Sequence, residues 1–180
     1  MAVSAATRIL KADIPVADFV TRFVDVPKFL LFCESCPNYG KRWSCPPYEF
    51  RVPAFWERYE QLSLMAMQVT PQTAEEKERA AKDGMAFLMP YRASLEAALT
   101  QKERMKKGSY RLNPGRCVGC GVCARVDGKP CRREDMCRYS LESLGADVGR
   151  VSEELLGVPI VWGQNGQAPE YFLLVGGLLT

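Results

Sequence analysis

The sequence contains no histidine in its 180 residues. Catalytic zinc, haem and mononuclear iron sites usually recruit imidazole, so this absence argues against all three. It also excludes Ser-His and Cys-His catalytic dyads. No GxxxxGK(S/T) or GxGxxG motif occurs in the strand-to-helix context that phosphate and dinucleotide binding require. The common nucleophilic hydrolases and nucleotide-binding enzymes are therefore not indicated.

Long apolar runs are also missing. The longest, residues 171–179, is shorter than the roughly 20 residues that a membrane-spanning helix needs. Residues 1–10 lack the basic region, the apolar region and the cleavage site of a secretory signal. We therefore expect a cytoplasmic protein with no membrane role.

What the chain does contain is cysteine. In a reducing cytosol, cysteines two or three residues apart indicate metal binding rather than disulfides. Such all-thiolate ligand sets suit iron–sulfur clusters or structural zinc. The eight cysteines form a first group of Cys33, Cys36 and Cys45 and a second group of Cys117, Cys120, Cys123, Cys131 and Cys137.

The net charge of +3 is too small to indicate a nucleic-acid partner, and no aromatic platform or known nucleic-acid fold stands out. The cations are unevenly placed, however, and gather beside the cysteines. A cluster held by thiolates is anionic, so nearby cations would offset its charge and attract an acidic redox partner protein. These cations are Lys41, Arg42, Arg51, Arg116, Arg125, Lys129, Arg132, Arg133 and Arg138.

The second group begins with a CxxCxxC run at Cys117, Cys120 and Cys123, which can hold three corners of a cubane. Bacterial ferredoxins complete such a run with a more distant cysteine next to a proline, and here Cys131 follows Pro130. Zinc more often uses two CxxC knuckles separated by a longer insert. The spacing therefore predicts a [4Fe-4S] cluster on these four cysteines, with zinc as the alternative.

The first group supplies only three thiolates, Cys33, Cys36 and Cys45. Three ligands leave one iron of a cubane open to water, a substrate atom or a small thiol, which is the arrangement of a Lewis-acid site. Alternatively, Cys137 closes this cluster, because eight cysteines also divide into four and four. A further interpretation makes Cys137 a buried cysteine on a helix face. The spacing does not choose among these alternatives.

Four sequence stretches, CPNYGKRWSCPPY, NPGRCVGCGVC, GKPCR and YSLESLGADV, resemble a family described as predicted metal-binding proteins, found largely in anaerobic bacteria and archaea. The resemblance extends from about Cys33 to Val161. It implies no established reaction. Family members often carry another residue at the position of Cys137, which favours the open three-cysteine site. The resemblance implies metal or iron–sulfur binding through Cys33, Cys36, Cys45, Cys117, Cys120, Cys123 and Cys131.

Apolar periodicity and breaker residues predict an α+β fold in one domain over residues 1–180. A helix should begin near Pro15 and end at Pro27. A helical hairpin should occupy 71–107, with its second helix beginning at Pro90, and two further helices should occupy 134–144 and 148–156.

Strands are expected at 62–69 and 110–112, together with a hairpin of 158–162 and 171–178. They should form a small antiparallel or mixed sheet covered by helices. Two cysteine-rich loops, 33–50 and 113–137, should carry the clusters.

These features favour electron transfer to a partner enzyme. One alternative is an enzyme that binds a small molecule at the open iron of the three-cysteine cluster. A second is a zinc-stabilised interaction module.

Overall fold

The computed structural model describes residues 5–180, and its centre is a four-stranded antiparallel sheet. The strand order is β1-β2-β4-β3, with β2 and β4 in the middle. The predicted α+β class with a small sheet covered by helices is therefore confirmed. The strands are β1 (Ala6–Pro15), β2 (Gln61–Thr70), β3 (Tyr110–Leu112) and β4 (Phe172–Leu179).

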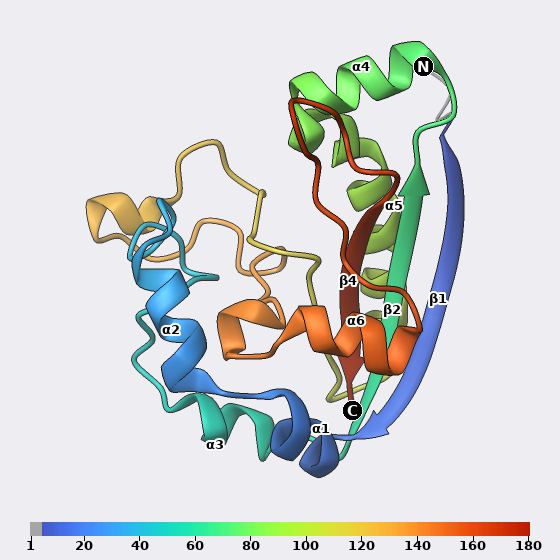
Figure 1. Cartoon of the computed structure of the whole chain (residues 1–180). Coiled ribbons are helices and arrows are strands. Elements are labelled where there is room, and N and C mark those ends of the chain that lie inside the picture. The colour runs from blue at the N-terminus through green and yellow to red at the C-terminus, as the bar shows by residue number, and fades with distance from the viewer. Residues whose placement is uncertain (1–4) are drawn as a thin grey trace.

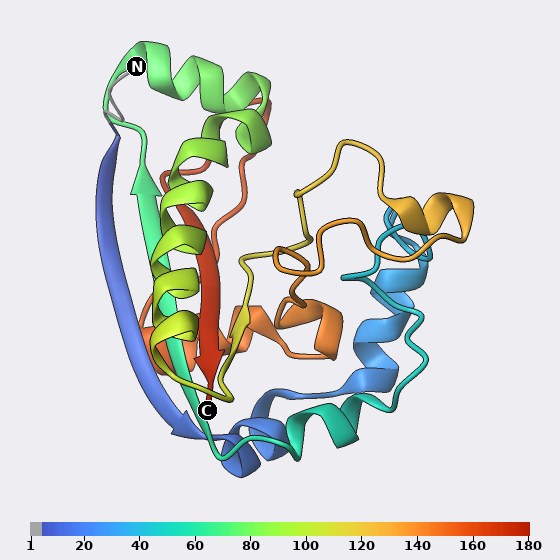
Figure 2. The same cartoon turned by 180° about the vertical axis from the view of Figure 1, so that it is seen from behind.

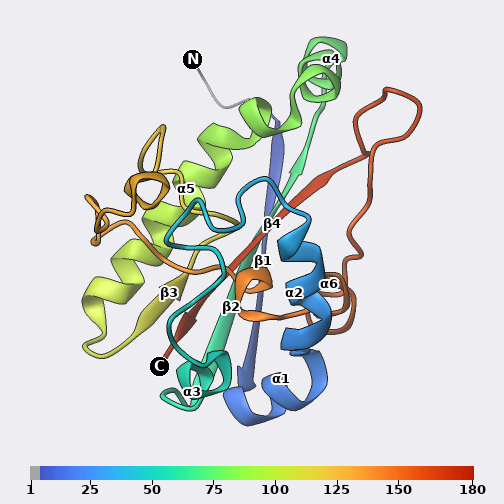
Figure 3. The same cartoon turned by 90° about the vertical axis from the view of Figure 1, so that its left-hand side faces the viewer.

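The two faces of the sheet pack against different helices (Figures 1 and 2). Helix α5 (Gly84–Met105) covers one face, and α1 (Val16–Phe23) and α6 (Val148–Leu156) cover the other. Figure 3 shows α5 and α6 on opposite sides of the strands. Strand β2 explains this layering, because successive strand side chains point to opposite faces and it has apolar side chains on both: Leu62 and Leu64 belong to one core, Met65 and Met67 to the other.

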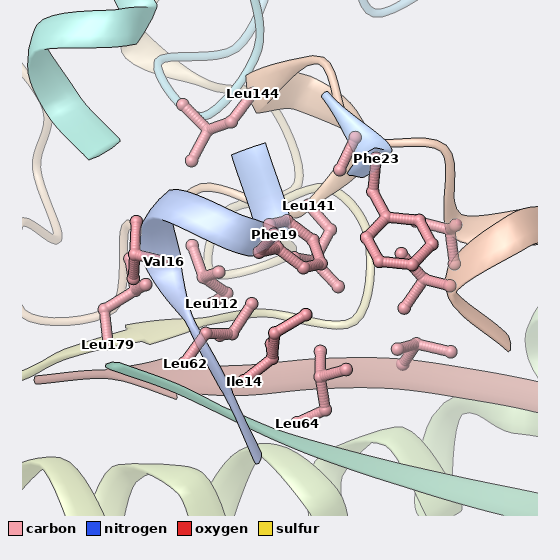
Figure 4. Packing of buried hydrophobic residues seen from close by; sticks show 14 of the residues in the cluster. Ile14, Val16, Phe19, Phe23, Leu62, Leu64, Leu112, Leu141, Leu144 and Leu179 are labelled. Atoms are coloured by element: carbon pink, nitrogen blue, oxygen red, sulfur yellow. The ribbon is translucent and has the colours of Figure 1, made fainter. Parts of the chain in front are cut away.

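The larger core lies under α1, α6 and the short helix α3 (Val52–Trp56) (Figure 4). Phe19 is fully buried there, and its ring centroid lies 5.4 Å from that of Trp56. The smaller core lies between the sheet and α5 and includes Met67 and Leu95. Neither core cluster contains a cysteine.

Side-chain caps set the helix boundaries on the α5 side. Thr73 and Glu76 form a capping box at the start of α4 (Ala74–Lys82). Asp83 then caps α5 by accepting a hydrogen bond from the Ala86 N–H at 3.0 Å. Helix α5 therefore begins at Gly84 and carries Pro90 inside it, whereas the sequence suggested a start at Pro90.

Two N-terminal elements were not predicted. Strand β1 was missed because it is an edge strand with mostly exposed side chains, so it lacks an apolar alternation. The helix predicted from Pro15 forms as α1 but ends at Phe23, and Pro27 lies in the first turn of a second helix, α2 (Val26–Glu34), instead of at a helix end. Asp25 caps α2 by accepting from the Lys28 N–H at 3.1 Å, and proline is compatible with the first turn of a helix.

The predicted helix over 134–144 is wrong; only the 3-10 turn η2 (Glu142–Leu144) forms at its end. Its backbone carbonyls bond elsewhere: Arg111 Nη2 donates to the Asp135 oxygen at 3.3 Å, and the Asn113 N–H donates to the Tyr139 oxygen at 2.8 Å. These long-range bonds replace the i to i+4 bonds of a helix.

The predicted hairpin between 158–162 and 171–178 is also wrong, because 158–162 forms no strand. Strand β4 pairs instead with β2, where Leu174 lies opposite Met67, and with β3, where Leu178 lies opposite Arg111. Both neighbours are far away in sequence. None of the helices in residues 5–180 combines the length and apolarity that crossing a bilayer requires.

Candidate metal centre

The first cysteine group lies at the end of α2 and in the irregular segment that follows it. Cys33 is in the last turn of α2, and the Cys36 N–H donates to the Cys33 oxygen at 3.0 Å. Burial, followed by the proximity of Cys45 and Cys36, raises the pKa of Cys33. The fold therefore places these three thiols close enough to influence one another, although eight residues lie between Cys36 and Cys45 along the chain.

In the second group, the structure places Cys117, Cys131 and Cys137 together. A hydrogen bond from Cys137 lowers the pKa of Cys117 to about 6, and the Gly119 N–H also donates to the Cys117 sulfur, at 3.5 Å. The Cys137 thiol in turn interacts with both Cys117 and Cys131, and these contacts raise its pKa. Cys137 therefore lies beside the second group, on a non-helical segment rather than on a helix face.

The remaining cysteines of the second group lie in the same segment, just before the 3-10 helix η1 (Ala124–Asp127). Cys120 and Cys123 are half-buried, as are all the other cysteines except the exposed Cys36. All eight thiols are free of disulfides.

The two cysteine segments lie side by side, away from the sheet (Figures 1 and 2). Direct hydrogen bonds join them. Ser44, which is 1% exposed, accepts from the Cys117 N–H at 3.0 Å. Arg42 Nη1 donates to the Cys117 oxygen at 3.3 Å, and Trp43 Nε1 donates to the Lys129 oxygen at 3.0 Å.

Arg125 strengthens the same contact from the second segment. Its Nη1 donates to the Arg42 oxygen at 2.9 Å and to the Cys45 oxygen at 2.6 Å, and Nη2 donates to the Pro47 oxygen. Its guanidinium carbon also lies 4.9 Å from the centroid of the Trp43 ring. One arginine therefore holds the chain around Cys45 against the second cysteine segment.

An unpaired arginine beside the cysteines fits an anionic metal group. Arg116 Nη1 is buried and has no hydrogen-bond partner among the residues that the structure describes. Burial, Arg42 and Arg92 lower the pKa of Arg116, whereas Cys45 and Cys36 oppose this shift. An unpaired guanidinium nitrogen among thiols is costly to bury, and the negative charge of a thiolate-ligated cluster would compensate it.

No three histidine, cysteine, aspartate or glutamate side chains in residues 5–180 are arranged to hold a single metal ion. A tetrahedral zinc site needs sulfurs about 3.8 Å apart, given zinc–sulfur bonds of about 2.3 Å. A cubane separates its cysteine sulfurs further, because irons and sulfides lie between them.

Several residues that join the two segments were not predicted. Nothing in the sequence marks Ser44 as a buried acceptor for the Cys117 N–H. Arg125 was expected only as a counter-charge beside the second group, not as a donor to the Cys45 carbonyl. Glu103, which binds both Arg111 and Arg138, lies on α5 with no sequence signal of its role.

A protein-family model matches residues 20–179, and its family is described as "Predicted metal-binding protein (DUF2284)". The chain belongs to this family. The match includes both cysteine groups, so metal binding by this family member is supported. No curated protein and no solved structure matches the chain.

Proposed function

We propose that this cytoplasmic protein carries two iron–sulfur clusters and transfers electrons to a partner enzyme. The observation that supports this most is the direct contact between the cysteine segments, in which Ser44 of one segment binds the Cys117 N–H of the other. Electron transfer rates fall steeply with distance, so two centres on adjoining segments would exchange electrons readily. A bound cluster would supply one-electron chemistry, while the protein fixes its position and surrounding charge.

The second group would hold a [4Fe-4S] cluster through Cys117, Cys120, Cys123 and Cys131. The first group would hold a three-cysteine cluster through Cys33, Cys36 and Cys45. The position of Cys137 beside Cys117 and Cys131 favours this division, because it leaves the first group without a fourth thiol.

The chain's own residues would set the charge around these clusters and stabilise their thiolate ligands. The Gly119 N–H, which donates to the Cys117 sulfur, would stabilise the thiolate. Arg42 and Arg116 would offset the negative charge of the first cluster. Arg132 and Arg133 are exposed on the outside of the second segment, where they would attract an acidic redox partner.

A second candidate function is binding and activation of a small molecule at the three-cysteine cluster. A cavity of about 190 Å³ opens beside Cys33. Its walls are mostly apolar, with Val26, Phe29 and Pro46, while Tyr48 and Glu142 add polar groups. This combination of apolar walls and a few polar groups is typical of small-molecule sites, and the volume suits a ligand of only a few heavy atoms.

Anaerobic purification followed by iron, acid-labile sulfide and zinc analysis tests the metal assignment. Two clusters predict iron and sulfide in nearly equal amounts, a visible charge-transfer absorption and EPR signals on reduction. Stoichiometric zinc without sulfide would contradict the proposal and favour a zinc-stabilised interaction module. Adding cyanide to the reduced protein then tests the open iron, because only a three-cysteine cluster should change its EPR spectrum.

A further inference from the structure

The outer edge of β4 is only partly paired. Strand β3 pairs with β4 over 177–179, and Leu112 opposite Gly177 is the last pair. The chain then leaves the sheet, because the Asn113 N–H donates to the Tyr139 oxygen at 2.8 Å. In the described part of the chain, no strand pairs with 172–176 on the side away from β2. Alternate residues of this five-residue stretch of β4 therefore present free backbone N–H and C=O groups at this edge.

This free edge borders an apolar groove of about 740 Å³. Four consecutive β4 residues, Phe172 to Val175, line the groove. Successive strand side chains point to opposite faces, so one cavity can contact all four only at the strand's edge. The opposite walls include Trp162, which is 80% exposed, and Met85, which is 50% exposed. The groove therefore offers both unpaired backbone and unburied apolar side chains.

The two edges of the sheet differ in how they are protected. The other edge strand, β1, carries Arg8, Lys11 and Asp13, and charged side chains discourage strand pairing. No charged residue occurs in β4. An apolar, uncharged and unpaired edge is an aggregation hazard unless a partner covers it. This contrast between the charged β1 edge and the uncharged β4 edge favours a binding role for the β4 edge.

The groove's charge identifies the partner. Asp83, Glu142 and Asp147 line it, and no lysine or arginine does. Lys28 Nζ lies 3.9 Å from Asp147, and burial raises the pKa of Glu142, but Asp83 is exposed and forms no ion pair among the described residues. Two copies of this face would bring these acidic groups together, so a second copy of the chain is disfavoured.

We propose that this groove binds an extended basic segment of another protein by strand addition to β4. About five residues of the partner, spanning roughly 17 Å, would pair with the backbone of 172–176. Alternate apolar side chains of the partner enter the groove and pack on Trp162. Its lysine or arginine side chains reach Asp83. The groove borders the second cysteine segment at Pro114 and Gly115 and shares Phe29 and Glu142 with the cavity beside Cys33, but no cysteine lines it.

Fluorescence anisotropy with the metal-loaded full chain tests the proposal. The probe is a fluorescein-labelled five-residue peptide with valine at positions one, three and five and lysine between them. We expect saturable binding, and binding at least about tenfold weaker for the same peptide N-methylated along its backbone, because methylation removes strand hydrogen bonds. Replacing both lysines by glutamate should weaken binding similarly.

Substitutions in the chain locate the site. Trp162→Ala should weaken binding of the lysine peptide about tenfold, since exposed tryptophans are frequent hot spots. Asp83→Asn should weaken it about threefold, as loss of one solvent-exposed ion pair would, while asparagine can still cap α5. Ile9→Ala, on the protected edge β1, is the matched control and should leave affinity unchanged. Circular dichroism melts confirm that all three variants are folded.

Three outcomes would overturn the proposal. One is the absence of saturable binding of the lysine peptide to the folded, metal-loaded protein. Another is equal affinity for the methylated or glutamate peptides. The third is a concentration-dependent dimer that Trp162→Ala abolishes, which would assign this face to a second copy of the chain.

Discussion

The Glu103 carboxylate on α5 accepts a hydrogen bond from Arg138 Nε at 2.8 Å. The same carboxylate accepts from the Arg111 backbone N–H at 2.9 Å and forms an ion pair with the Arg111 guanidinium. Arg111 and Arg138 lie immediately on either side of the segment that carries the second cysteine group. Glu103 therefore fastens both ends of that segment to one helix.

Replacing Glu103 with glutamine should destabilise the protein by about 2–4 kcal/mol at pH 7, because it leaves two largely buried arginines without their carboxylate. Burial disfavours the charged form of Glu103, but hydrogen bonds from Arg138 and Arg111 outweigh this and lower its pKa. The carboxylate's contribution is therefore complete above about pH 4.3 and is lost as pH falls through the lowered pKa. The free energies of unfolding of the unmodified protein and of the Glu103→Gln variant, measured by urea denaturation, should converge as the pH drops below about 4.

Glu154→Gln is the matched control for this prediction. Glu154 also binds two arginines, Arg22 and Arg150, but its ion pairs are exposed to solvent. Solvent screening makes such pairs contribute little, so the melt should barely change. Equal destabilisation by the two variants would contradict the role assigned to Glu103.

Cys120→Ser should remove about half of the iron and sulfide, because it deletes one of the four ligands proposed for the second cluster. The protease sensitivity of 113–137 should rise, while the far-UV circular dichroism of the sheet should persist. Full iron content together with an unchanged melt would show that Cys120 is not a ligand.

Cys137→Ala tests whether the three-cysteine cluster is open. Because Cys137 lies beside Cys117 and Cys131, the substitution should alter only the EPR signal of the second cluster. Cyanide should still perturb the signal of the first cluster, in the variant as in the unmodified protein. If cyanide has no effect on the unmodified protein and Cys137→Ala converts the first cluster to a three-iron form, Cys137 is its fourth ligand and the protein is a saturated two-cluster carrier.

Gly176→Ala should destabilise the protein by about 1–3 kcal/mol through overpacking. A Cβ at this position would lie 2.7 Å from the Leu112 oxygen and 2.7 Å from Leu99 Cδ1, where β3, β4 and α5 meet. Gly121→Ala is the control, because a Cβ there would contact nothing within 4 Å. Thermal melts of the two variants measure the difference.

The sequence predicted best the elements whose signals are local. The apolar β2 strand and helix α6, which ends at Gly157 in a left-handed conformation, both formed where expected. The segment 134–144 failed because Arg111 and Asn113 take its carbonyls, and both lie more than 20 residues away. No window of neighbouring residues contains that information.

The candidate site shows the same division. CxxCxxC spacing is local, and the ligand segment that it predicts around Cys120 stays a prediction. The bonds from Arg125 to the Cys45 carbonyl and from Cys117 to Ser44 depend on how two distant segments meet. The position of Cys137 also depends on how the two segments pack, so the spacing alone did not decide which cysteine group it joins.

The exclusion of cysteine from both cores has a consequence for how the protein is made. A newly synthesised chain can complete its sheet and bury Phe19 before any metal arrives. For the proposed clusters, iron delivery would then be a later step at a preformed surface. Iron starvation would limit how much of the protein is loaded, not how much of it folds.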